Sequence, residues 1–210
     1  MSRRDLLRPG LRPILALVLA MGLVASACGN GAAYVPAGIV RTPTPDVSDI
    51  VLPDITNGVD MAFVAETGGV LVVYWGYTAC PDVCPTTLAE VRKALREIGD
   101  QAELVDVAMV TVDPDRDTVE VLPVYVQAFV ADGVAVRTED AEVLAAAAEP
   151  FGVQYSVTIQ DDGWVDVVHT GFLYAIDDQG MIRLTWPFGI ESEDIAADLR
   201  ALLDEESSNG

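Results

Sequence analysis

Residues 70–88 hold the feature that most constrains the fold, an apolar run followed at once by two closely spaced cysteines. The segment from Val70 to Tyr77 is almost entirely apolar, as expected of a strand covered on both faces. Cys80 and Cys84 follow in the sequence Cys-Pro-Asp-Val-Cys-Pro, and helical periodicity begins directly after them. We therefore predict a buried strand that delivers two thiols to the start of a helix.

Apolar strand patterns and helical patterns alternate along the rest of the chain. The predicted strands are residues 70–77, 104–112, 135–138, 172–176 and 181–185, and the predicted helices are residues 86–98, 121–129 (capped by Asp117 or Thr118), 140–148 and 195–203. This order predicts an α/β fold with a mixed central sheet flanked by helices. Two short runs, residues 50–55 and 61–64, flank Asn57-Gly58 and predict an additional β-hairpin at the N-terminal side.

The first 27 residues resemble a lipoprotein signal peptide. Basic residues that include Arg3 and Arg4 precede an apolar run at residues 14–24, which is shorter than the about 20 residues that span a bilayer. Cys28 follows Ala-Ser-Ala, as in signals whose cysteine becomes lipidated; ordinary cleavage, with Cys28 left as a spare thiol, is the alternative. The export route, general or twin-arginine, stays open. We predict a lipid anchor at Cys28 and a place on the extracytoplasmic face of the cell membrane.

Composition divides the remaining chain and excludes one class of partner. Residues 28–49 are rich in Gly, Ala, Pro and Thr and predict a flexible tether, residues 50–203 a folded domain, and residues 204–210 a frayed polar tail. The chain has 33 acidic and 12 basic residues and a net charge of −21. Such a surface repels nucleic acid, so we predict no nucleic-acid partner.

Cys80, Cys84 and His169, the only histidine of the chain, are the candidate chemical site. The positive end of the predicted helix favours thiolate at both cysteines, and their spacing would allow both sulfurs to chelate one ion. Cu(I) is soft and tolerates low coordination, whereas Zn(II) would require a fourth ligand. Because the Asp82 carboxylate could supply one for zinc or Cu(II), the residues favour copper without excluding zinc.

Three blocks of the sequence resemble the SCO/SenC family. They are residues 76–85 (Gly-Tyr-Thr-Ala-Cys-Pro-Asp-Val-Cys-Pro) with Leu88, residues 112–118 (Val-Asp-Pro-Asp-Arg-Asp-Thr) with Tyr125 and Phe129, and Val168-His169 with residues 172–177 (Phe-Leu-Tyr-Ala-Ile-Asp). The match covers about residues 50 to 203. The resemblance implies a thioredoxin-like fold and a membrane-anchored copper protein that helps assemble the copper centre of cytochrome c oxidase subunit II. It implies Cu(I) or Cu(II) ligation by Cys80, Cys84 and His169, and a supporting role for residues 113–117.

Two other roles for the thiols remain open. The pair could cycle as a disulfide and keep the copper-site cysteines of a partner reduced, with Cys80 attacking and Cys84 resolving. It could also be a structural disulfide, although closing so short a loop stabilises little. Thioredoxin-like enzymes commonly space their cysteines by two residues, and the three-residue spacing here favours chelation. The predicted partner is therefore subunit II of cytochrome c oxidase or another copper protein.

Overall fold

The protein is described here from a computed structural model, in which residues 34–209 are placed. The chain from Val35 onward forms one compact unit. The predicted signal peptide and Cys28 lie outside the described residues. Within residues 34–209, no helix combines the length and the apolar character that a membrane crossing requires.

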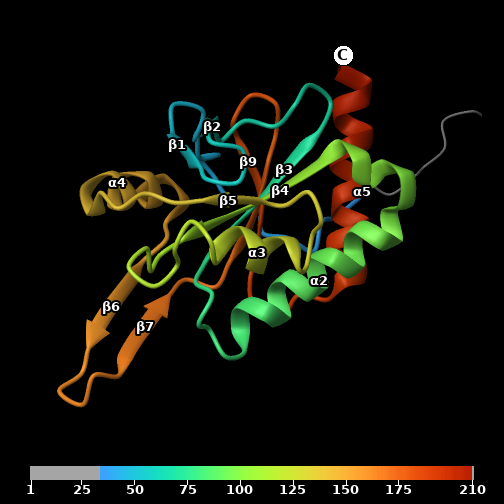
Figure 1. Ribbon diagram of the computed structural model, residues 1–210. Coiled ribbons are helices and arrows are strands. Elements are labelled where there is room, and N and C mark those ends of the chain that lie inside the picture. Colours follow the sequence, from blue (N-terminus) through green and yellow to red (C-terminus); the bar gives the residue numbers. More distant parts are fainter. Residues whose placement is uncertain (1–33, 210) are drawn as a thin grey trace, which may run out of the picture. The chain divides into compact units, whose positions relative to one another are not determined.

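A seven-stranded mixed sheet forms the centre of this unit (Figure 1). Its strands, in spatial order, are β2 (Val59–Ala62), β1 (Val51–Asp54), β5 (Val134–Val136), β4 (Val105–Thr111), β3 (Val70–Gly76), β8 (Leu173–Ile176) and β9 (Ile182–Trp186). β3, β4 and β5 are parallel, and their neighbours on both sides are antiparallel. The sheet confirms the predicted mixed α/β architecture, and β1 and β2 confirm the predicted N-terminal hairpin.

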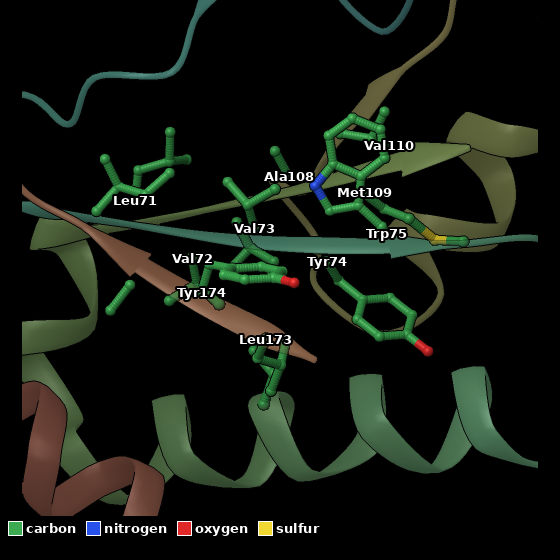
Figure 2. Packing of buried hydrophobic residues seen from close by; sticks show 14 of the residues in the cluster. Leu71, Val72, Val73, Tyr74, Trp75, Ala108, Met109, Val110, Leu173 and Tyr174 are labelled. Carbon is green, nitrogen blue, oxygen red and sulfur yellow. The ribbon is translucent and has the colours of Figure 1, made fainter. Parts of the chain in front are cut away.

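Helices cover both faces of the sheet. They are α2 (Val83–Ile98), α3 (Leu122–Gln127), α4 (Ala141–Phe151) and α5 (Ser192–Asn209), with a 3-10 turn at Gly99–Leu104. Figure 2 shows Tyr74 and Leu173 on the side of β3 that faces α2. On the other face, Phe151 at the end of α4 packs edge-on against Trp75, with ring centroids 5.4 Å apart. Since every residue of β3 is buried, its apolar run is explained by helices on both sides.

The pairing of β8 with β3 determines where the distant histidine lies. Leu173, the first residue of β8, is opposite Tyr74, close to the carboxyl end of β3. The cysteines follow that end of β3, and His169 is four residues before Leu173. The strand register therefore brings His169 to the same edge of the sheet as the two thiols.

The structure contains a second, two-stranded sheet that the sequence analysis missed. β6 (Tyr155–Ile159) and β7 (Val165–His169) form an antiparallel hairpin, whose turn includes Gly163 at a φ of 84°. His169 is the last residue of β7, and β8 begins after a short link.

Both ends of the described chain are bound to the domain. Ile39 pairs with Thr185 of β9, and the backbone N–H of Gly38 donates to the buried Asp198 at 2.8 Å. The segment predicted as a flexible tether is thus bonded to the domain from residue 37 onward. The predicted frayed tail is the last part of α5, where Arg183 forms ion pairs with Glu205 and Glu206 at 2.7 and 2.8 Å.

A candidate metal and thiol site

Cys80 and Cys84 meet at the start of α2, and both are free thiols. The loop after β3 places the Cys80 Sγ over the first turn of the helix. The backbone N–H of Cys84 donates to this sulfur at 3.3 Å. The Cys80 side chain therefore accepts a hydrogen bond from a helix N–H group that otherwise has no partner within the helix. This contact fixes the sulfur of Cys80 beside that of Cys84.

The two thiols differ in acidity. Burial raises the pKa of Cys80, but the backbone N–H groups of Cys84 and Asp82 outweigh it, and the net pKa is lowered. Burial raises the pKa of Cys84 to about 12. We predicted thiolate character at both positions. That prediction is wrong for Cys84 in the metal-free protein, because its sulfur lies fully inside the core, where desolvation exceeds the effect of the helix.

His169 presents one ring nitrogen to the sulfurs and fixes the other on the main chain. Nδ1 lies 3.0 Å from the backbone carbonyl of Thr170. A carbonyl oxygen only accepts, so Nδ1 carries the proton, and burial lowers the pKa of the ring, which keeps it neutral. Nε2 therefore carries a lone pair, and it lies 3.6 Å from the Cys84 Sγ. This is the hydrogen-bonding pattern of a histidine that ligates a metal through Nε2.

The three candidate ligands form one cluster. The two Sγ atoms and a ring nitrogen of His169 all lie within 4.8 Å of one another. Asp82, considered as a fourth ligand, is exposed, and its carboxylate faces the Thr86 hydroxyl at 3.5 Å instead. Two soft sulfurs and one neutral imidazole fit a thiophilic ion of low coordination number better than Zn(II), which favours four ligands.

The loop at residues 113–117 is hydrogen-bonded to the loop between β3 and α2, which carries Cys80 and is called the cysteine loop below. The buried carboxylate of Asp117 accepts from the Thr78 backbone N–H at 3.1 Å and from the Thr111 hydroxyl at 2.6 Å. Arg116 pairs with Asp113 and lies over the ring of Tyr77, 5.7 Å from its centroid. We expected Asp117 or Thr118 to cap α3 with its side chain. No side chain caps α3. Its N-cap position is Val121, the Asp117 carboxylate is bonded to the cysteine loop, and the Thr118 hydroxyl accepts from the Glu120 N–H at 3.3 Å.

Replacing Asp117 with alanine is expected to lower the free energy of unfolding by about 2–4 kcal/mol. The change leaves the half-buried Thr78 donors and the fully buried Thr111 hydroxyl without their acceptor, and each such loss costs roughly 1–3 kcal/mol. Chemical denaturation measures the effect, and Asp115→Ala, at an exposed position in the same loop, is the matched control. Equal stability of the two variants would contradict a supporting role for Asp117.

Three further residues shape the site, and the sequence alone gave none of them a separate role there. A Cβ at Gly76 would lie 3.1 Å from the Cys84 Sγ and 2.6 Å from the Tyr74 ring, so only glycine leaves the sulfur its space. Tyr74 and Tyr77 turn their rings edge-on to His169, with centroid separations of 6.1 and 5.7 Å. Their aromatic side chains hold the imidazole in place. The only sequence signal for this role was their closeness to Cys80.

Comparison with known proteins agrees with this architecture. The sequence model of the SCO1/SenC family matches residues 56–204. The chain is 34% identical over 113 residues to the human mitochondrial SCO1 homolog, a match that covers 52% of this chain and 37% of that longer protein.

Two solved structures resemble the fold closely. Copper-bound ScoI of Bradyrhizobium japonicum is 30% identical with a TM-score of 0.64, covering 73% of this chain and 96% of that one. Apo Sco1 of Thermus thermophilus is 30% identical with a TM-score of 0.70, covering 82% of this chain and 99% of that one. The fold is thioredoxin-like, as predicted. With its paired thiols, its neutral imidazole and a family match over most of its length, the chain belongs to the SCO1/SenC family.

Proposed function

We propose that this protein is a copper metallochaperone that holds one copper ion on Cys80, Cys84 and His169. The observation that carries the proposal is the orientation of His169, whose unprotonated Nε2 faces the Cys84 sulfur while Nδ1 is held by a carbonyl. The copper-bound structure of the Bradyrhizobium relative supports the choice of metal. The family resemblance supports cytochrome c oxidase subunit II, or another copper protein, as the recipient.

The geometry suits a cargo that must be released as well as bound. Three ligands satisfy Cu(I) while leaving its coordination open to an incoming thiolate or imidazole from a recipient. Cys80 lies at the surface end of the cluster with 9% of its side chain exposed, whereas Cys84 is fully buried. We therefore expect transfer by ligand exchange to begin on the Cys80 side.

The test is an anaerobic titration of the reduced protein with Cu(I) against a competing chelator. We expect one Cu(I) per chain. Since the thiol of Cys84 has a pKa of about 12, copper must displace its proton, and the apparent affinity should rise by at least about tenfold per pH unit between pH 6 and 8. A stoichiometry of zero, or tight binding of zinc in preference to Cu(I), would refute the proposal.

A thiol–disulfide reductase is the second candidate, and the asymmetry of the two cysteines favours it. Cys80 has the lowered pKa of an attacking thiol and is the less buried of the two cysteines, and Cys84 is the fully buried neighbour that would resolve a mixed disulfide. In this role Cys80 thiolate attacks a partner's disulfide, Cys84 then releases the partner's thiol, and the chain retains the new disulfide. His169 has no part in either step.

We further propose that Cys28 carries a lipid that holds the chain on the extracytoplasmic face of the cell membrane. The lipoprotein-like signal at residues 1–27 supports this proposal. Expression of Cys28→Ser beside the wild-type chain, followed by membrane fractionation, tests it. Release of the variant from the membrane is the expected outcome, and equal retention would exclude lipidation at this residue.

A further inference from the structure

The β6–β7 hairpin stands apart from the main sheet and carries a residue of the metal site. It forms its own two-stranded sheet, and Figure 1 shows it extending away from the central strands and from α2. Its last residue is His169, opposite Tyr155 at the base of the hairpin. Anything that binds the hairpin is therefore linked to the imidazole by one continuous strand.

One face of the hairpin is an apolar row that begins at the metal site. Alternation places the pairs Tyr155–His169, Val157–Val167 and Ile159–Val165 on the same face, in that order from base to turn. Exposure increases along the row, since Tyr155 and Val167 pack against the core while Val157 is 40% and Ile159 73% exposed. Trp164, 69% exposed, lies at the turn next to Val165 and by the same alternation belongs to the opposite face, together with the 61% exposed Val168. Large apolar side chains gathered on one exposed element are typical of a binding surface.

The negative charge of the hairpin indicates which kind of partner this surface can bind. Residues 155–169 include Asp161, Asp162 and Asp166, all exposed, and contain neither lysine nor arginine. The whole chain carries a net charge of −21. A second copy of the chain would bring like charges together, and an anionic lipid surface would repel the turn. The surface therefore fits a protein with an apolar patch bordered by lysine or arginine.

We propose that the apolar row of the hairpin (Tyr155, Val157, Ile159, Val165 and Val167) is the docking surface for the copper-exchange partner, which has a basic rim around its own metal ligands. The inference rests on the proposed copper-delivery function and adds the surface that brings the partner to it. Docking on this row places the partner beside His169, so that one binding event both selects the recipient and positions its ligands.

The experiment uses the full-length chain in detergent and the copper-free soluble domain of cytochrome c oxidase subunit II from the same organism. Calorimetry measures the affinity of the complex, and stopped-flow spectroscopy measures Cu(I) transfer. Ile159→Ser is the test variant and Val59→Ser, 58% exposed on β2 of the other hairpin, is its matched control. Asp161→Asn tests the charge, with the exposed Asp60→Asn as its control.

We expect Ile159→Ser to weaken the complex and slow transfer by about tenfold, while Val59→Ser leaves both unchanged. Asp161→Asn should slow association at low salt and lose that effect at high salt, unlike Asp60→Asn. Cu(I) affinity and delivery to a small chelator should be unchanged in all four variants, because none of them is a ligand.

Three outcomes of this experiment distinguish failure of the docking-surface proposal from failure of the proposed copper-delivery function. If no complex forms, or if Ile159→Ser binds as tightly as wild type, the docking surface is refuted, whatever the copper affinity. If sedimentation shows wild type self-associating through this row, or if the row instead binds vesicles of anionic lipid, it is equally refuted. If the hairpin variant weakens the complex but no copper is transferred by wild type, the surface stands and the delivery function fails.

Discussion

His169→Ala is expected to weaken Cu(I) binding on the order of 100-fold, or about 2.7 kcal/mol. Loss of a residue that merely orients a ligand costs about 10–100-fold in metal affinity, so loss of the ligand itself should reach at least the upper end. Competition against a Cu(I) chelator measures the change. The fold should survive, because His169 ends a surface hairpin and is only half-buried.

His169→Met is the second variant to compare. Because a thioether is also a soft ligand, it should recover part of the Cu(I) affinity and little of the Cu(II) affinity. Circular dichroism of each variant controls for folding. The same pair separates the two proposed functions, because disulfide reduction should proceed normally without an imidazole. Wild-type Cu(I) affinity in the correctly folded alanine variant would remove His169 from the site and leave the reductase as the better assignment.

Replacing either cysteine with serine is expected to reduce Cu(I) affinity further, by roughly 1,000-fold, or about 4 kcal/mol. Each thiolate provides both a soft donor and a negative charge, and a hydroxyl provides neither at neutral pH. Metal content after dialysis against a chelator reports the loss. Because Cys84 is fully buried and Cys80 is at the edge, Cys84→Ser should also cost more folding stability than Cys80→Ser.

The two serine variants also differ in whether they accumulate a mixed disulfide with a partner. If the protein reduces a partner, Cys84→Ser should accumulate a mixed disulfide through Cys80, because the resolving thiol is missing. Cys80→Ser should trap nothing, since the Cys84 sulfur is inaccessible to a partner. Non-reducing electrophoresis with the oxidised subunit II domain distinguishes them. Two variants that both bind copper like wild type would refute the metal site, and two that both trap a partner would refute the assigned order of attack.

Local sequence was sufficient to predict most of the main sheet. The unbroken apolar character of β3 and β4 predicted strands covered on both faces, and Asn57-Gly58 predicted the hairpin of β1 and β2. Asp140 was expected to begin α4, and its carboxylate does accept from the N–H groups of Glu142 and Val143. These features depend on neighbours in the chain, which is why they could be predicted without the fold.

The features that depend on contacts between distant parts of the chain could not be predicted from the sequence. β6 has one polar residue in every two and no burial on most of its length, so its pattern resembles a loop. The tail after residue 203 is polar, yet Arg183, distant in the sequence, draws Glu205 and Glu206 into the helix. For the site, the sequence predicted which three residues meet. It could not predict that Cys84 lies so deep that its thiol stays protonated, since that depends on Tyr74, Gly76 and the packing of α2.

The hydrogen bond between the His169 ring and the Thr170 carbonyl makes the orientation of the imidazole a property of the peptide backbone. The Thr170 side chain has a different task, accepting from the Gln154 N–H at the base of the hairpin. Any residue at position 170 that preserves the main-chain path would supply the same acceptor. Redesign of the centre for another soft ion, such as Ag(I), can therefore vary the surrounding side chains while the tautomer of the histidine is inherited unchanged.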